Sequence, residues 1–555
     1  MPRRLGRRRP DRLIGPPAAL LAALLLITGC TVVAGVAAPT GTAPARTGAS
    51  SGPTASDPGA AESTPPSTPG PTTDPTSVTP VEPTAPATSD GDTPAEPAND
   101  DVVPAPADEQ APDGIGAVGI GDDYYPESGN GGYQVEDYHL GISYVPETNQ
   151  LRGTADIALT VTASNDLRRF NFDLQSPMKV SAVSVGGTAA RFRQQDAELE
   201  ITPAVPLGAG AGTKVRVVYA GKPTAVNGGT SGLGDGGWYR TRSGGALAVG
   251  EPLSASSWFP VNEHPADPAS YSLTVTVPSK WKVMGPGVPV TNDLPKVPSG
   301  SSVFGWYQQQ PVASYLVPLY IDTFTAVTDT SGPIPIYSAI AAGDATDTRL
   351  DSGTGRYLQV LQKYFGDYPF DSAGGIYTDE SIPFALETAS RPVYADWVDE
   401  ETVIHELAHQ WYGDHVLVQR WQDICLNECF ASYAPWLYQE DVDGADLDAE
   451  WRDQMASSGD EVWGIPLIDM GPGSEFTTVY TRGPLAIHAL RAEMGETAFL
   501  SLLKRWPAEH AGNATFGELQ EFAEELSGKD LEQFFQVWFR ATTAPSVSDY
   551  PASLR

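Results

Sequence analysis

Two histidines and a glutamate stand at a spacing that suits chemistry at a metal ion. His405 and His409 are four residues apart, and Glu406 directly follows the first of them. On an α-helix this spacing places both imidazoles on one face, where they can bind one metal ion, with Glu406 about 100° round the helix. The segment therefore predicts a zinc site that has a carboxylate beside it.

A third ligand follows His409 after 18 intervening residues. Glu428 lies in a second segment with a helical pattern, and two histidines with one glutamate form a ligand set that leaves one coordination position for water. At such a site the water is acidified and the scissile carbonyl of an amide is polarised. Glu406, which is not a ligand, can take the proton from the water and pass it to the leaving amine. We therefore predict a hydrolase with one zinc ion per chain.

The helix that carries the two histidines belongs to a part of the chain where the apolar residues repeat at helical spacing. Residues 356–365 and 403–413 show this spacing, Thr515 to Glu518 has the form of a capping box, and 531–539 carry one apolar stripe. Short strands are expected near 375–377 and 384–387. We predict a mostly helical domain over 336–555 with helices at its C-terminal end.

A different pattern precedes this helical part. From Tyr138 to about Ile340 apolar and polar residues alternate in short runs separated by Gly and Pro, which is typical of antiparallel strands. We predict an all-β N-terminal domain over 131–335, resembling an antiparallel β-sandwich. The predicted fold class is therefore α+β, with two folded domains.

The first 30 residues have the features of an export signal. Clustered arginines precede an apolar run from Ala18 to Ile27, which is too short to span a membrane comfortably. The ending Ile27-Thr-Gly-Cys30 resembles the bacterial lipobox, in which the cysteine is lipidated. We expect a lipoprotein signal peptide over 1–30 and a protein that is outside the cytoplasm, anchored to the bacterial cell membrane through Cys30. Plain secretion is the alternative, and the choice between Sec and twin-arginine export stays open.

The following segment and the overall charge limit the partners. Residues 31–130 are rich in Pro, Thr, Ala and Ser with scattered acidic residues, a composition typical of a disordered tether. The net charge of −35 argues against nucleic acid or anionic lipid headgroups as partners. Three cysteines in 555 residues do not form a disulfide framework, so stability must come from packing and metal. We expect a monomer.

The metal-binding segments resemble those of a known family. His405-Glu-Leu-Ala-His409, the 18-residue interval and Glu428 in Leu426-Asn-Glu428 are similar to the motifs of the gluzincin aminopeptidases related to aminopeptidase N. The likeness covers roughly residues 135–545. It implies a thermolysin-like catalytic domain, a short bacterial lipoprotein-type member, and peptide substrates that have a free N-terminus.

Three further residue roles follow from this resemblance alone. Tyr480, in Val479-Tyr-Thr-Arg-Gly483, matches the tyrosine that donates to the tetrahedral oxyanion. Glu387, in Phe384-Ala-Leu-Glu-Thr388, matches the glutamate that binds the free amine of the substrate, and Glu251 matches a second residue directed at that amine. Phe384, Leu386 and Thr388 replace the usual glycine, methionine and asparagine, which leaves the shape of the first subsite open.

The residues around Glu428 also depart from the family. Cys425 and Cys429 stand where a large aromatic residue and a glycine are usual. We expect two small buried thiols, because residues four apart on a helix hold their Cβ atoms about 5–6 Å apart, beyond disulfide reach. Capture of the metal by Cys425 is an alternative. Two interpretations carry equal weight for three polar residues: they orient the metal ligands, or they cap helices. These residues are Asp414, Asp423 and Asn427. No role is expected for His264, His415 and His488.

The sequence leaves two other functions open. One is a zinc metalloendopeptidase, favoured if the altered segment around Glu387 no longer holds an ammonium group. The other is a non-catalytic surface lipoprotein that binds zinc for structure or ligand capture. Retention of both Glu406 and Tyr480 favours the enzyme, since a protein that had lost activity would be expected to have lost one of them.

Overall fold

The computed structural model describes residues 111–227, 233–341 and 345–555, which belong to one compact unit over Ala98–Arg555. The predicted signal peptide, Cys30 and most of the predicted tether lie outside the described residues. Within the described ranges, every helix is too short or too polar to cross a membrane.

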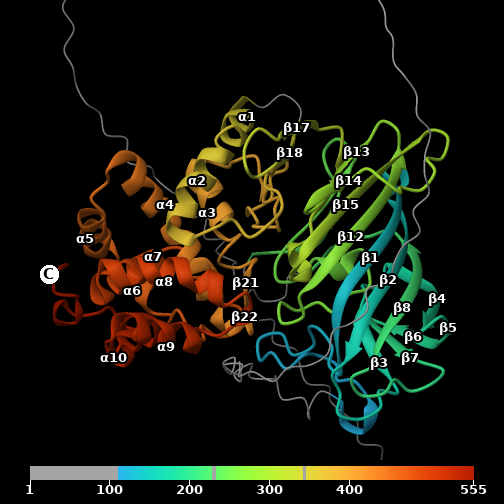
Figure 1. Ribbon diagram of the computed structural model, residues 1–555, viewed down its shortest axis with the longest axis horizontal. Coiled ribbons are helices and arrows are strands. Elements are labelled where there is room, and N and C mark those ends of the chain that lie inside the picture. The colour runs from blue at the N-terminus through green and yellow to red at the C-terminus, as the bar shows by residue number, and fades with distance from the viewer. Residues whose placement is uncertain (1–110, 228–232, 342–344) are drawn as a thin grey trace, which may run out of the picture. The chain divides into compact units, whose positions relative to one another are not determined.

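The first part of the fold is built on an eight-stranded sheet in the order β14-β15-β12-β1-β2-β8-β4-β5, drawn in blue to green in Figure 1. β1 and β12 pair in parallel, and the other neighbours pair antiparallel. Burial alternates along β2, as its alternating sequence predicts. The bounds are β1 Tyr133–Val145, β2 Gln150–Val161, β4 Met178–Val185, β5 Thr188–Ala189, β8 Gly212–Gly221, β12 Ala269–Pro278, β14 Val288–Val290 and β15 Ser301–Val312.

Two smaller sheets complete this β-rich part. One has the order β13-β16-β11-β10-β9 and the other β3-β7-β6. Their bounds are β3 Phe170–Asp173, β6 Arg191–Gln195, β7 Glu198–Thr202, β9 Ala225–Val226, β10 Gly236–Tyr239, β11 Ala246–Val249, β13 Lys282–Met284 and β16 Leu319–Asp322. β11 is buried along its whole length, and Glu251 follows it by two residues.

The second part combines a four-stranded sheet, β17-β18-β19-β20, with ten α-helices among the described residues (Figure 1). The strands are β17 Thr325–Asp329, β18 Ile336–Ile340, β19 Ile376–Tyr377 and β20 Val393–Tyr394, and a separate pair is formed by β21 Val416–Val418 and β22 Gly512–Ala514. The helices are α1 Ala345–Asp351, α2 Thr354–Phe365, α3 Glu400–Ala408, α4 Cys425–Asp443, α5 Leu447–Ser457, α6 Asp460–Trp463, α7 Arg482–Met494, α8 Glu496–Glu509, α9 Phe516–Ser527 and α10 Glu532–Phe535.

Several predicted elements are confirmed. The predicted helix over 356–365 is α2, and the capping box of Thr515 and Glu518 begins α9. The apolar stripe over 531–539 forms α10 and a π-helical turn, Gln536–Arg540. The α+β fold class, with a β-rich part followed by a helical part, is confirmed.

The helix α3 is well specified by its own residues. The side chain of Asp399 caps its N-terminus by accepting a 2.9 Å hydrogen bond from Thr402 N, and two glutamates in the first turn complement the helix dipole. Gly413 follows at φ +133°, and a Cβ atom there would lie 3.0 Å from His409 Nδ1. Glycine is therefore required where the chain turns against the imidazole.

The predicted end of the tether at residue 130 is too late. Asp122 and Asn130 are buried, because the segment from 111 carries apolar and aromatic residues that pack against the fold. Asp122 Oδ2 accepts hydrogen bonds from Trp421 N at 2.8 Å and His264 Nε2 at 3.3 Å. This short N-terminal arm therefore contacts both the β-rich and the helical part, and His264 has a structural partner.

Two boundaries within the fold also differ from the predictions. A domain boundary at 335 would separate β17 from β18, yet these strands pair with each other and β18 continues in parallel to β19. β17 therefore belongs to the sheet of the helical part. The predicted strand at 384–387 is reduced to a single bridge between Leu386 and Val393. Leu386 and Val393 exchange two backbone hydrogen bonds, and further backbone and side-chain hydrogen bonds hold the rest of the segment.

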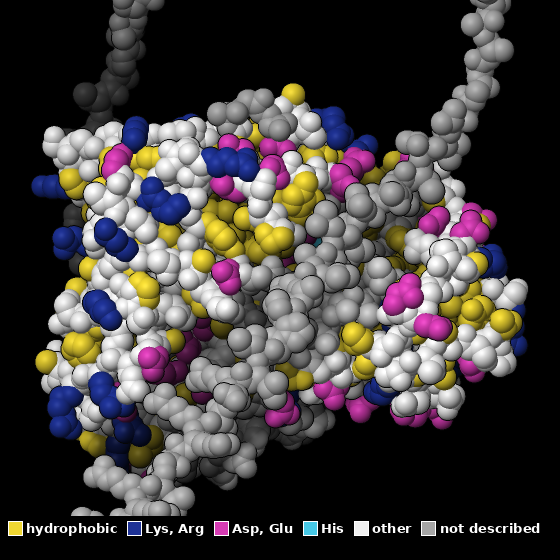
Figure 2. All heavy atoms as spheres, turned by 180° about the vertical axis from the view of Figure 1, so that it is seen from behind, with side chains coloured by type: hydrophobic (Ala, Val, Ile, Leu, Met, Phe, Trp, Pro, Cys, Tyr) yellow, Lys and Arg dark blue, Asp and Glu magenta, His cyan; other side chains and the backbone are white. Residues whose placement is uncertain are grey.

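Acidic and basic side chains are mixed on the surface. Figure 2 shows Lys and Arg side chains scattered between Asp and Glu side chains over the visible described residues.

Candidate active site

Helices α3 and α4 bring the three predicted metal ligands together. Nε2 of His405 and Nε2 of His409 are 3.1 Å apart, and Glu428 Oε2 lies 3.3 Å from the first and 3.5 Å from the second. His405 comes from the last turn of α3 and His409 is the C-terminal cap of that helix, while Glu428 comes from the first turn of α4. Three atoms with free lone pairs thus converge on one point.

This ligand set fits a zinc ion. Tetrahedral ligands bound at about 2.0–2.2 Å lie roughly 3.3 Å from one another, which is the spacing of these three atoms. Two imidazole nitrogens and a carboxylate oxygen are also the donor types that zinc takes. Without a cation, three buried lone pairs facing each other would be unfavourable.

Hydrogen bonding and burial prepare the histidines for this role. Nδ1 of His409 donates to the carbonyl oxygen of Tyr412 at 2.9 Å, which leaves the lone pair of Nε2 directed at the other ligands. Burial lowers the pKa of His405, so its imidazole is neutral, as a ligand must be. At His409 burial acts in the same direction, but the carboxylates of Glu428 and Glu387 outweigh it and raise the pKa. The site therefore favours a cation.

Glu406 lies beside the metal ligands without joining them. It is only 6% exposed, and one oxygen of Glu406 lies within 4.8 Å of ligand atoms of both Glu387 and His409. Burial raises the pKa of Glu406, and the neighbouring carboxylates of Glu387 and Glu428 add to this against the lowering effect of His409. A raised pKa suits a group that must accept and hold a proton near neutral pH.

Glu387 is buried next to Glu406 and held on both sides. Its Oε1 accepts a 3.1 Å hydrogen bond from the Tyr315 hydroxyl, and its main-chain oxygen accepts a 2.9 Å bond from Gln410 Nε2. Gln410 Oε1 in turn accepts from Ser390 N at 2.7 Å. Gln410 therefore joins α3 to the Glu387 segment. The departures at Phe384, Leu386 and Thr388 leave the Glu387 carboxylate in the site.

Glu251 reaches the same cluster from the β-rich part. It is buried, and its Oε1 has no hydrogen-bond partner among the residues that the structure describes. Burial raises the pKa of Glu251, and the carboxylates of Glu387 and Glu428 raise it further. Glu251 and Glu387 therefore form a second acidic position beside the metal ligands, suited to a second cation.

Tyr480 lines the open side of the site. Its ring centroid lies 5.9 Å from that of His405, and the residue is 43% exposed. Desolvation, followed by the carboxylates of Glu428 and Glu251, raises the pKa of its hydroxyl. The hydroxyl therefore stays protonated and can donate a hydrogen bond.

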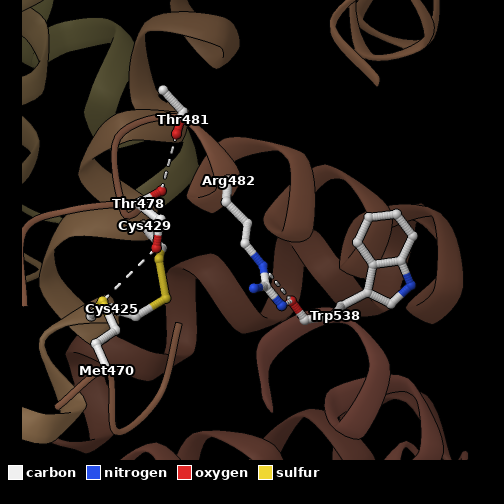
Figure 3. The surroundings of a disulfide bond; sticks show 7 residues. All are labelled: Cys425, Cys429, Met470, Thr478, Thr481, Arg482 and Trp538. Atoms are coloured by element: carbon white, nitrogen blue, oxygen red, sulfur yellow. Dashed lines mark hydrogen bonds between the residues drawn. A yellow bond between two sulfur atoms is a disulfide. The ribbon is translucent and has the colours of Figure 1, made fainter. Parts of the chain in front are cut away.

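The turn that carries Tyr480 is anchored by a buried arginine. Arg482, at the start of α7, donates to the carbonyl oxygen of Trp538 at 2.8 Å (Figure 3) and to that of Ile465 at 2.6 Å. These bonds fix the N-terminal end of α7 against the C-terminal segment. Tyr480 precedes Arg482 by two residues, so its backbone is held in place from one side.

The structure places the three polar residues that had two open interpretations, Asp414, Asp423 and Asn427, in different surroundings. Asp414 and Asn427 are buried near His409: Asp414 N donates to His409 O at 2.9 Å, and Asn427 faces Gly413 beside the imidazole. Asp423 instead accepts a hydrogen bond from the backbone of Phe516 at the start of α9. The first two adjoin a metal ligand, and the third caps a helix.

Sequence reasoning missed two residues that shape the site. Gln410 directly follows His409, and that position just after the metal-binding helix was the available signal. Tyr315 lies in a short 3₁₀ turn, Ser314–Leu316, far from every motif, and no local pattern singles it out. Both contact Glu387, so both act on the acidic position rather than on the metal ligands.

The prediction that Cys425 and Cys429 remain separate thiols is wrong. The structure joins them in a disulfide whose Cα atoms are 4.8 Å apart, within the range of disulfides (Figure 3). The prediction assumed regular helix geometry, with Cα atoms four residues apart separated by about 6 Å. Cys425 is the first residue of α4, and the Cα separation of 4.8 Å there is shorter than in a regular helix. A disulfide also removes Cys425 as a metal ligand.

This disulfide encloses Glu428 and should stabilise the turn that carries it. We expect Cys425→Ala/Cys429→Ala to lower the free energy of unfolding by about 2 kcal/mol, the amount that closing so short a loop gives. Zinc affinity should fall severalfold as the Glu428 turn loosens. Denaturant unfolding and zinc titration measure both effects. Thiol counting on the denatured, unreduced wild type is the control, and reaction of Cys425 and Cys429 in it would contradict the disulfide.

A helix-borne His₂Glu ligand set with a neighbouring glutamate, behind a β-rich part, defines the gluzincin class of metallopeptidases. A model described as the peptidase family M1 domain matches residues 372–538. A solved M1 zinc metallopeptidase from Deinococcus radiodurans is 30% identical, with a TM-score of 0.71 over 78% of this chain and 99% of that one. The chain belongs to the M1 family of zinc metallopeptidases, whose members use one catalytic zinc ion.

Other relatives agree with this assignment. Aminopeptidase N of Streptomyces lividans is 25% identical over 311 residues, which cover 50% of this chain and 36% of the relative. The chain thus spans about a third of the length of the curated relatives that it matches. A variant of the Deinococcus radiodurans enzyme, solved with a Tyr-Ser-Ala substrate, is 30% identical with a TM-score of 0.69 over 77% of this chain and 99% of that one.

Proposed function

We propose that the protein is a zinc-dependent aminopeptidase that releases N-terminal residues from peptides with a free α-amino group. The observation that carries the proposal is the pair of buried carboxylates, Glu387 and Glu251, beside the metal ligand set. An ammonium group there would relieve the repulsion between the two carboxylates. It would also fix the substrate so that only the first peptide bond reaches the metal ligands. The bound Tyr-Ser-Ala substrate of the Deinococcus radiodurans relative supports a peptide substrate.

The chain's own residues then have distinct tasks. His405, His409 and Glu428 hold the zinc ion, which supplies an acidified water and a polarised carbonyl when bound. Glu406 accepts the proton of the attacking water and delivers it to the nitrogen of the leaving amine. The Tyr480 hydroxyl donates a hydrogen bond to the oxyanion that develops on the scissile carbonyl. Glu387 and Glu251 bind the α-ammonium group and so determine which peptide bond lies at the metal site.

The decisive experiment compares a free peptide with its N-acetylated form. We expect release of the first residue from the free peptide only, loss of activity with a chelator, and recovery on adding zinc. Equal cleavage of both forms would favour a metalloendopeptidase. Stoichiometric zinc without hydrolysis across a broad peptide library would favour a zinc-binding surface protein.

We further propose that the protein works as a monomer outside the cytoplasm, lipid-anchored at Cys30 or secreted. The location is supported by the sequence alone, through the lipobox-like ending Ile27-Thr-Gly-Cys30. Cys30→Ala should move the protein from the membrane fraction to the medium. Retention at the membrane in that variant would contradict a lipid anchor.

A further inference from the structure

Glu475 is a buried carboxylate residue that the proposed reaction does not use. It lies in the irregular segment between α6 and α7, five residues before Tyr480. The side chain is 0% exposed, and neither carboxylate oxygen has a hydrogen-bond partner within the described ranges. A buried carboxylate without a partner is costly to the fold. A partner from outside the chain is the direct way to remove that cost.

The N-terminal arm places Glu475 next to the acidic position. The Tyr124 hydroxyl donates to Asp469 Oδ1 at 2.8 Å and accepts from Gly471 N at 2.7 Å, so the arm is fixed on the Glu475 segment. The neighbouring Tyr125 hydroxyl is buried and is directed at Glu475, outside regular hydrogen-bond geometry. Burial raises the pKa of Tyr125, and its interactions with the Glu475 carboxylate and then the charge of Glu251 raise it further. Tyr125 therefore lies within electrostatic range of both carboxylates.

Aromatic contacts connect the same place to Glu387. The ring centroids of Tyr125 and Trp421 are 5.9 Å apart in an edge-on contact, and those of Trp421 and Tyr315 are 5.7 Å apart. Tyr315 is the residue that donates its hydroxyl to Glu387. A line of three aromatic side chains thus leads from one amine-binding carboxylate to Glu475. Aromatic faces with a carboxylate behind them suit the apolar stem and cationic head of a lysine or arginine side chain.

The geometry points to Glu475 as a specificity residue that binds the cationic side chain of an N-terminal arginine or lysine. This inference rests on the proposed aminopeptidase function, because it assigns Glu475 to the first residue of the same substrate. A planar guanidinium can donate two parallel hydrogen bonds to the two free oxygens of Glu475. The α-ammonium group of the substrate stays with Glu387 and Glu251.

The test uses L-arginine and L-citrulline, which have nearly the same shape and differ in side-chain charge. In calorimetric titrations of the zinc-loaded wild type, we expect arginine to bind at least about tenfold more tightly than citrulline. Glu475→Gln should remove that ratio while citrulline binding changes less than about twofold. Glu461→Gln, an exposed change in α6, is the matched control and should keep the wild-type ratio.

Hydrolysis gives a second readout. Wild type should cleave arginyl and lysyl peptides with a higher kcat/KM than leucyl peptides, and Glu475→Gln should lower only the first two, by about 10- to 100-fold. Equal binding of arginine and citrulline by wild type would overturn the inference, as would an equal loss for all ligands in a folded Glu475→Gln. Cleavage without this selectivity leaves the aminopeptidase proposal intact. Selective binding without cleavage overturns that proposal and supports the role of Glu475.

Discussion

Glu406→Gln is expected to lower kcat by about 10³-fold or more while leaving one zinc ion bound per chain. The amide has the shape of the carboxylate but cannot accept the proton of the attacking water. The side chain is nearly buried and is not one of the three converging ligand atoms, so the change should leave the metal site intact. Steady-state kinetics on a free tripeptide and elemental analysis of the purified variant measure the two quantities.

Glu401→Gln is the matched control for this variant. Glu401 lies on the same helix α3, is exposed and carries the same charge, so its replacement should change kcat by less than about twofold. Loss of zinc from Glu406→Gln would mean that Glu406 supports the ligands rather than the proton transfer. Retention of more than a tenth of the wild-type kcat would contradict its role as the base.

The three metal ligands could be predicted because local geometry determines them. Two residues four apart on one helix share a face whatever surrounds the helix, so His405 and His409 needed only the prediction of α3. Glu428 required one additional assumption, a second helix that crosses the first. The structure has that helix, and the ligand atoms lie 3.1–3.5 Å apart.

The residues around the acidic position could not be predicted in the same way. Tyr315 and Tyr125 reach it from segments 72 and more residues away from Glu387, through contacts that exist only in the folded chain. No periodicity marks such residues. Glu251 and Glu387 were found through resemblance to a family rather than through spacing.

Composition misled the prediction at the end of the tether. Residues 111–130 continue the Pro, Gly and Asp content of the preceding segment, yet Tyr124 and Tyr125 supply apolar surface that the fold buries. Asp122 offsets the cost of its own burial by accepting bonds from Trp421 N and His264. A few well-placed side chains therefore outweigh average composition, and this arm then shapes the site.

Glu387→Gln is expected to lower kcat/KM for free peptides by about 10²-fold, which corresponds to roughly 3 kcal/mol for a buried carboxylate that loses its contact with an ammonium group. The amide can still accept the hydrogen bond from Tyr315, and the main-chain bond from Gln410 is unaffected, so the fold around it should persist. For N-acetylated peptides, which carry no ammonium group, the same change should alter the already low rate by less than about threefold. The ratio of the two kcat/KM values is therefore the informative measurement.

A matched control removes one charge from the same segment without touching the site. Glu380 is partly buried, and its Oε1 accepts a hydrogen bond from Arg242 N at 2.6 Å. If a general loss of negative charge weakened substrate binding, Glu380→Gln would lower the ratio of the two kcat/KM values as well. If the carboxylate of Glu387 acts on the substrate amine, only Glu387→Gln will lower the ratio, and zinc content will stay at one ion per chain. An unchanged ratio in Glu387→Gln would mean that Glu251 alone binds the amine, since Glu251 is the other buried carboxylate of the acidic position.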